Sequence, residues 1–179
     1  REVTENDAYA NLVFPKVLRK HRVFGRDAAF ATELFYGSLR AQGRLDAVLS
    51  QCVDRPLNKI DSNVRHVLRL GAYQMLDMDV PPHAAASETV GLAREVTGAG
   101  SASLVNAVLR RIGEKTKEEW LEVIAPRTDG GQSDSSIAIE YSHPEWVVRA
   151  LRDALKAHGR NPQELTALLE AHNLSLIHI

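Results

Sequence analysis

The sequence has almost no cysteine, few aromatic residues and no long hydrophobic run. Its single cysteine, Cys52, excludes an internal disulfide and a cysteine-based zinc site, and favours a reducing, cytoplasmic setting. Aromatic residues make up only 6% of the 179 residues. The longest uncharged stretch, residues 96–109, has 14 residues and includes Gly, Ser and Asn, so it is too short and too polar to span a membrane. No basic-then-apolar segment opens the chain, so the sequence predicts no secretory signal.

Alanine and leucine are abundant instead, with 22 and 21 copies. Both residues favour helices, and residues 1–125 contain no alternating apolar pattern long enough for a sheet. The sequence therefore predicts an all-α fold. Its 44% apolar and 25% charged residues exclude a disordered or collagen-like chain. At roughly 150 residues per domain, the length corresponds to one domain and a fraction.

Neither basic nor acidic residues are in clear excess over the whole sequence, because the formal net charge is only −1. That value conceals a local imbalance, since residues 16–69 contain eleven basic and five acidic residues and carry +6. The segments 1–15, 70–125 and 126–179 carry −2, −3 and −2. The basic segment is either a solvated face of long side chains or a phosphate-binding patch, which requires clustered Lys and Arg. The near-neutral total does not exclude a nucleic-acid partner.

Apolar spacing and breaker residues divide the chain into helices. They are expected over residues 11–20, 26–42, 45–53, 62–75, 83–96, 101–112, 117–124, 144–156 and 162–171. Pro15 is expected in the first turn of its helix, Asp61 and Ser101 at N-caps, and Gly43 at a break. The helix over 26–42 is apolar on nearly all sides except for one charged stripe and Asp27, which is expected in the first turn facing the helix dipole. This pattern predicts a central place in a bundle. The stripe carries Arg26, Glu33, Arg40 and Arg44.

Composition changes sharply after the helix that ends near residue 124. Residues 126–136 contain no large apolar residue, which is typical of a linker. Residues 1–125 are therefore expected to form one helical domain. Residues 137–173 are expected to be the start of a second, mainly helical connecting subdomain, which opens with a short extended piece at 137–141. The last residues, 174–179, are expected to be a non-native tail.

Four segments of the first domain carry family-like motifs. They are RD…EL…GSLR at residues 26–40, VLRLGAYQML at 67–76, SETVGLA at 87–93 and SLVNAVLRR at 103–111. In this order and spacing they resemble the NusB family, whose domains are all-helical RNA-binding modules. The resemblance covers about residues 8–125. It implies a NusB-like helical bundle with a truncated N-terminal helix.

The chain continues beyond that domain with YSHPEWVV at residues 141–148 and LLEAHN at 168–173. These segments resemble the connection in the RsmB family of small-subunit rRNA cytosine-C5 methyltransferases, which carry a NusB-like N-terminal domain. In that family an arginine-bearing half-helix precedes the point where this chain begins. A proline-led strand follows the point that matches residue 173, and LSLIHI does not match it. The resemblance implies that the catalytic domain is absent from this sequence.

The family places its chemistry in the missing domain, which is Rossmann-like, binds S-adenosylmethionine and carries two catalytic cysteines. The resemblance implies that this fragment holds no cofactor or metal and does not methylate alone. Its implied role is to grip a small-subunit rRNA stem-loop and hold the target cytosine toward its own C-terminal methyltransferase domain. A cytoplasmic monomer without a membrane partner is expected. Cys52 lies at a helix end and is expected to be packed and inert.

NusB-like domains contact RNA mainly through the N-terminal arm and adjacent helix surfaces, so the resemblance assigns RNA binding to the basic segment. The expected RNA-binding residues are Lys16, Arg19, Lys20, Arg22, Arg26, Arg40, Arg44, Arg65 and Arg69. Phosphate contacts would supply affinity, and unstacked bases would stack on arginine planes. Structural roles are expected for Glu88, Asn106, Arg110, Ser142, His143 and Pro144. Glu88 is expected to pair with Arg69 or Arg110, and His143 to help start the helix after Pro144.

Two other functions remain open at this point. One is a NusB-type transcription antitermination factor that binds RNA and a ribosomal protein, although the residues beyond 136 speak against a free-standing factor. The other is a helical protein-interaction module without an RNA role. A steep fall of log affinity for rRNA with log salt would favour the RNA-binding functions, because it reports phosphate contacts.

Overall fold

The computed structural model describes residues 3, 6, 8–78, 80–128, 131–161 and 163–174, and within these residues it contains helices and no strand. The expected all-α fold is confirmed. The named helices are α2 (Ala10–Lys20), α3 (Gly25–Arg40), α4 (Gln42–Cys52), the 3-10 helix η1 (Leu57–Lys59), α5 (Ser62–Asp77), α6 (Pro82–Thr97), α7 (Ala99–Ile112), α8 (Lys117–Ile124), α9 (Asp134–Glu140), α10 (Glu145–Ala157) and α11 (Glu164–Asn173). Among the described helices, none is both long and apolar enough to cross a membrane. The expected non-native tail lies outside the described residues except for Leu174.

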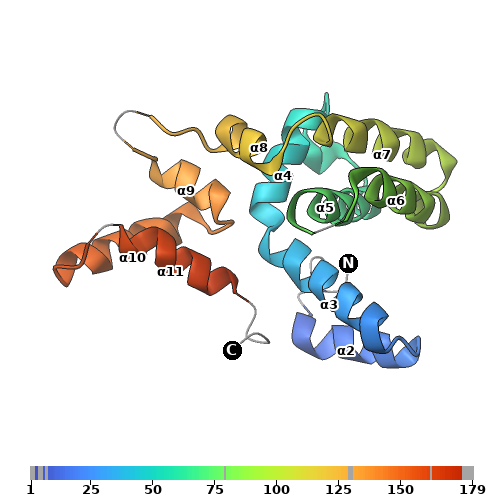
Figure 1. Cartoon of the computed structure of the whole chain (residues 1–179), viewed down its shortest axis with the longest axis horizontal. Coiled ribbons are helices and arrows are strands. Elements are labelled where there is room, and N and C mark those ends of the chain that lie inside the picture. The colour runs from blue at the N-terminus through green and yellow to red at the C-terminus, as the bar shows by residue number, and fades with distance from the viewer. Residues whose placement is uncertain are drawn as a thin grey trace.

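The main core lies where α4, α5, α6 and α7 pack together, with α8 closing one end (Figure 1). Its largest side chains, including Leu45, Leu49, Leu68 and Leu109, are fully buried. Gly71 on α5 allows this close approach, because a Cβ there would lie 2.8 Å from both Leu109 Cδ2 and Thr89 Cγ2. The leucine and valine residues that recur at helical spacing in the sequence are thus the ones that face this core.

Local signals set several helix ends. Asp61 caps α5 as expected, since its carboxylate accepts the backbone N–H groups of Asn63 and Val64. Ser101 does not cap α7, because that helix already begins at Ala99 after Gly98, whose φ is +88°. Pro15 lies inside α2, beyond the first turn that was expected.

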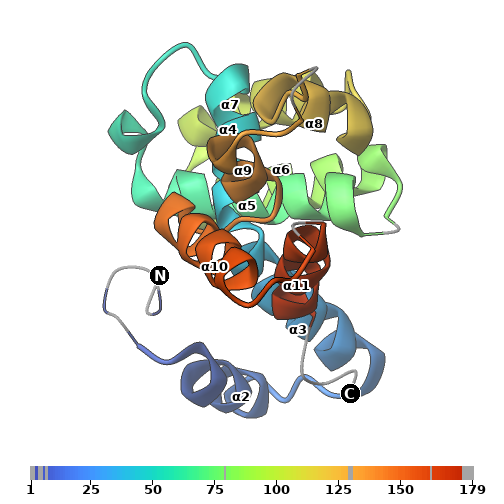
Figure 2. The same cartoon turned by 90° about the vertical axis from the view of Figure 1, so that its left-hand side faces the viewer.

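The N-terminal arm, formed by α2 and the first half of α3, is thinly packed. No residue of α2 is buried, and the helix is held to α3 by Phe14, whose ring stacks on Phe35 with centroids 4.2 Å apart. Only Gly37 and Ser38 of α3 are buried, so the expected central position of this helix is wrong for its first half. Phe30 in this half lines a surface pocket with Leu70 of α5 and Ala84 of α6 but stays 44% exposed, and Figure 2 shows α2 lying apart from the bundle.

The helices α9, α10 and α11 form a second, smaller core. Its buried members are Ile137, Ala138, Val148, Leu165 and Leu169. Residues 137–141 are not extended as expected, because α9 already begins at Asp134. The Ser133 hydroxyl starts this helix by accepting the backbone N–H of Ser136. The final residues of the expected linker over 126–136 are therefore helical.

Candidate nucleic-acid interface

Five cations surround the turn between α2 and α3, and we call them the basic patch. They are Lys16, Arg19, Lys20, Arg22 and Arg26, and all are exposed. The first three share one face of α2 because they lie three and four residues apart. Among the residues that the structure describes, none of the five has an ion-pair partner. Within the described residues, ion pairs therefore do not neutralise the positive charge of the patch.

Exposed apolar side chains lie among these cations. Phe24, between Arg22 and Arg26 in the chain, is 69% exposed, and Val17 on α2 is 43% exposed. An aromatic ring next to guanidinium groups is a surface on which a nucleobase can stack. The prediction from sequence named only the cations in this region and missed Phe24. Its position inside the run of cations was the available signal.

The other four arginines predicted to bind RNA lie in different surroundings. Arg69 donates two hydrogen bonds to Asp46, at 2.7 and 2.8 Å, and its side chain is only 12% exposed. Arg44 donates to Asp77 at 2.6 Å. Arg40 lies 3.8 Å from Glu33, and the Nε atom of Arg65 is buried. Arg44 and Arg69 are therefore held in close ion pairs, whereas Arg65 Nε has no hydrogen-bond partner among the described residues. The cations of the basic patch are exposed, whereas all four of these arginines are partly buried.

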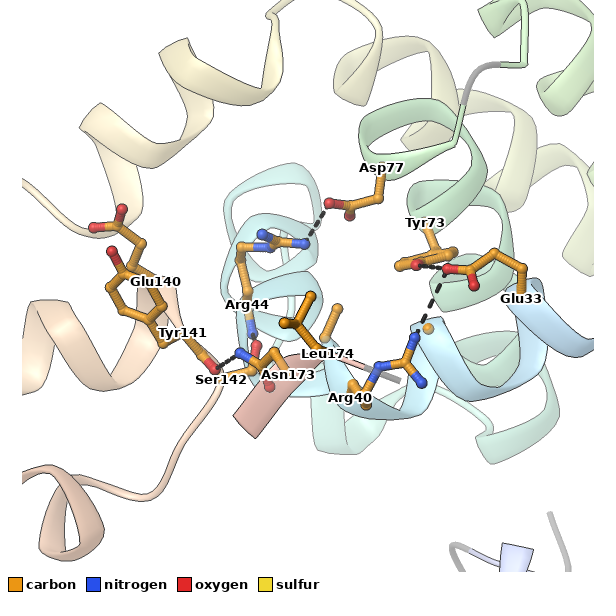
Figure 3. A pocket seen from close by; sticks show the side chains of 12 residues that line it. Glu33, Arg40, Arg44, Tyr73, Asp77, Glu140, Tyr141, Ser142, Asn173 and Leu174 are labelled. Atoms are coloured by element: carbon orange, nitrogen blue, oxygen red, sulfur yellow. Dashed lines mark hydrogen bonds and ion pairs between the residues drawn. The ribbon is translucent and has the colours of Figure 1, made fainter. Parts of the chain in front are cut away.

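A pocket of about 370 Å³ lies where α3, α4 and α5 meet α9 and α11 (Figure 3). In it Asp77 accepts hydrogen bonds from both Arg44 and Lys117, each at 2.6 Å. Tyr73 donates to Glu33 at 2.6 Å, and burial together with this carboxylate raises the pKa of the Tyr73 phenol above its usual range. The pocket lies at the joint between the two helical units, and its paired charges link α3, α4, α5 and α8 within the first unit.

The Ser142–Pro144 segment contributes to this joint. Ser142 has a left-handed φ of +54°, and its hydroxyl accepts the backbone N–H of Arg44 at 2.9 Å. It therefore caps α4 from 98 positions away in the chain. His143 Nδ1 contacts the carbonyl of Tyr141 at 2.7 Å, which orders the turn before Pro144, the residue at the N-cap position of α10.

The ion pair expected for Glu88 is not formed among the described residues. Arg69 pairs with Asp46 on α4, which lies opposite it, and Glu88 is exposed without an ion-pair partner among the described residues. The expected pairing of Glu88 with Arg69 or Arg110 is therefore wrong. Asn106 and Arg110 are exposed on α7.

Cys52 is buried against the main core, as expected. Burial raises the pKa of its thiol to about 11, although the nearby Arg111 acts in the opposite direction. A thiol with this pKa is almost entirely protonated near neutral pH and is a poor nucleophile. No group of His, Cys, Asp or Glu in the described part of the chain is arranged to hold a metal ion.

Comparison with known proteins gives the family. The NusB family model matches residues 1–114. The chain is 43% identical over 171 residues to a Mycobacterium tuberculosis protein named "Putative methyltransferase Rv1407", covering 94% of this chain and 36% of that protein. It is 33% identical over 171 residues to ribosomal RNA small subunit methyltransferase B of Pseudomonas putida, covering 96% and 35%. The corresponding Vibrio vulnificus protein is 31% identical over 148 residues, covering 83% and 31%.

The chain spans about a third of the length of these relatives. The identity extends past the NusB match into the α9–α11 unit, since the matches cover 94% and 96% of this chain. The chain belongs to the NusB family, and over most of its length it is homologous to small-subunit rRNA methyltransferases B, of which it covers only about a third.

Proposed function

We propose that this chain is the RNA-binding N-terminal region of a 16S rRNA (cytosine-C5) methyltransferase. The observation that carries the proposal is the basic patch on α2 and α3, with five exposed cations that have no ion-pair partner in the described structure. The relatives are named as small-subunit rRNA methyltransferases, which supports rRNA as the ligand.

The physical basis of binding is charge neutralisation with added stacking. Lys and Arg that contact phosphates release condensed counterions, which gives affinity without sequence preference. Guanidinium groups also hold phosphates through paired hydrogen bonds. The exposed ring of Phe24 adds a stacking surface for an unpaired base in an rRNA loop. The patch would therefore favour a stem-loop over a uniform duplex.

The proposed role in catalysis is positioning. The part of the longer relatives that this chain does not cover would hold S-adenosylmethionine and the catalytic residues. The Ser142 cap on α4 would help keep the two helical units in a fixed orientation while RNA is bound, because its hydrogen bond with the Arg44 N–H links them. By itself the chain should bind rRNA in the cytoplasm without transferring a methyl group.

The test is a salt titration of binding to a small-subunit rRNA hairpin. Simultaneous replacement of Arg19, Lys20 and Arg22 by Ala should weaken binding and lower the slope of log affinity against log salt by about one unit per lost contact. The matched control replaces three exposed cations elsewhere, Arg94, Arg127 and Lys156. An unchanged slope in the first variant, or an equal loss in the control, would remove the basic patch from the proposal.

A further inference from the structure

A second groove lies far from the basic patch, where the C-terminal ends of α4 and α7 meet. Its volume is about 600 Å³, and residues of α4, α7 and the connection between α4 and α5 line it. The apolar lining includes Ile60, Leu104, Ala107 and Val108. We call it the α4–α7 groove. In Figure 1 the C-terminal end of α4 lies at the end of the molecule opposite to α2.

Arginines form the rim of this groove. Arg55 and Arg110 are exposed, and neither has an ion-pair partner among the described residues. Arg111 is held in place, because it donates to the carbonyl oxygen of Cys52 at 3.0 Å. That bond occupies a carbonyl at the end of α4, which offsets the negative end of the helix dipole.

Two acidic residues limit the charge of the groove. Asp54 lies 3.4 Å from Arg111, but its side chain is 95% exposed, so this ion pair is weak. Glu114, which also lines the groove just after the end of α7, is exposed. Three arginines against two carboxylates leave a net charge of +1. A groove with this balance suits a ligand with few negative charges and an apolar face, and disfavours a strongly acidic peptide.

We propose that the α4–α7 groove binds one unpaired nucleotide of the RNA, with the base on the apolar floor and the phosphate between Arg55 and Arg110. A nucleotide carries one charge per phosphate and a flat face that packs on apolar or guanidinium surfaces. Arg111, fixed by the Cys52 carbonyl, offers its remaining N–H donors without a large loss of side-chain freedom. This inference rests on the proposed RNA-binding function.

The groove and the basic patch would contact different parts of one RNA. They lie at opposite ends of the stretch formed by α3 and α4, whose 27 helical residues have a contour length of about 40 Å. A short oligonucleotide can occupy one site only, whereas a longer rRNA stem-loop can reach both. The two sites are therefore separable by experiment.

The experiment measures hairpin binding by the whole chain with two kinds of variant. Replacing both Arg55 and Arg110 by Ala should weaken binding about tenfold and reduce the salt slope. Ala107→Phe fills the exposed part of the groove without changing charge, and should weaken binding while the salt slope stays constant. Matched controls are Arg94→Ala and Ala150→Phe, both at exposed positions on other helices. A hairpin with 4-thiouridine at unpaired positions should crosslink to α7 residues that line the groove.

The outcomes separate this inference from the proposed function. If groove variants bind like their controls while the basic-patch variant loses affinity, the groove assignment is overturned and the proposed function stands. If the unmodified chain binds no rRNA hairpin at any salt concentration, the proposed function itself fails. Crosslinks to α7 that a polyglutamate peptide displaces but an oligoribonucleotide does not would also overturn the groove as a nucleotide site.

Discussion

In the bundle of α4–α7 large apolar side chains such as Leu45, Leu49, Leu68 and Leu109 are fully buried, whereas in α2 no residue is buried and Leu12 is 56% exposed. The cations of the two regions also differ in how far they are engaged by other side chains. Arg44 and Arg69 in the bundle donate hydrogen bonds to buried or half-buried carboxylates, while the five cations of the basic patch have no such partner among the described residues. The paired arginines that stabilise the bundle are thus separated from the five cations of the basic patch, which are unpaired in the part of the chain that the structure describes.

The largest effect that tests this comparison is on stability. Leu109→Ala should lower the free energy of unfolding by about 2–5 kcal/mol, because a fully buried leucine leaves a cavity. The matched change on the arm, Leu12→Ala, should cost less than about 0.5 kcal/mol. Urea unfolding followed by circular dichroism measures both. Equal losses would mean that the arm contributes to the core as much as the bundle does.

A smaller effect is expected for the ion pairs. Arg69→Ala should destabilise the chain by roughly 1–3 kcal/mol, since it leaves the Asp46 carboxylate without its two hydrogen bonds. Arg19→Ala on the arm should leave the unfolding midpoint unchanged and weaken rRNA binding instead. A shift of the unfolding midpoint by Arg19→Ala, or no shift by Arg69→Ala, would contradict the distinction between the arginines of the bundle and those of the arm.

A still smaller loss of stability is expected when the joint between the two helical units is altered. Ser142→Ala removes the hydroxyl that accepts the Arg44 N–H, and should cost about 1 kcal/mol. Ser142→Asn should retain more stability, because asparagine tolerates the left-handed φ of +54° and carries an acceptor oxygen. Hydrogen exchange at the Arg44 amide measures the cap directly. Unchanged exchange in Ser142→Ala would exclude the cap.

The sequence was sufficient to predict helices and caps wherever these depend on residues close together along the chain. The helix expected over 117–124 has these bounds, and Asp61 caps α5, because capping and i, i+4 spacing are local. The IAI run at residues 137–139 was misassigned as extended, because a short apolar run does not distinguish strand from helix. The Ser133 cap and packing against α10 decide it.

For the candidate site, too, the sequence predicted local features but not contacts between distant residues. The contiguous cluster over 16–26 could be read from sequence, because neighbours along one helix and its following loop lie together in space. The surroundings of Arg69 and Arg44 could not, since their partners lie 23 and 33 residues away and charge counting does not pair them. The α4–α7 groove was also missed, because Arg55 and Arg110 meet only through the packing of α4 on α7.

The smallest effect is expected for the ionisation of the buried Cys52 thiol, which alkylation of this residue can measure. Burial raises the pKa of Cys52 from 9.0 to about 11, so at pH 8 its thiolate fraction is about a hundredfold lower than in the unfolded chain. Alkylation by iodoacetamide should therefore be slow in the folded chain and fast in urea. Because the folded pKa is raised, the stabilisation linked to the protonated thiol is complete below about pH 9 and is lost as the pH rises toward 11.

The control for this probe places a thiol on the arm. Val17→Cys in a Cys52→Ala background should react at the rate of an unfolded thiol, because Val17 is 43% exposed and no residue of α2 is buried. Mass spectrometry follows both reactions over time. If Cys52 in the folded chain reacts as fast as the introduced cysteine, the bundle opens readily near Cys52, and its contrast with the arm would hold only for the time-averaged structure.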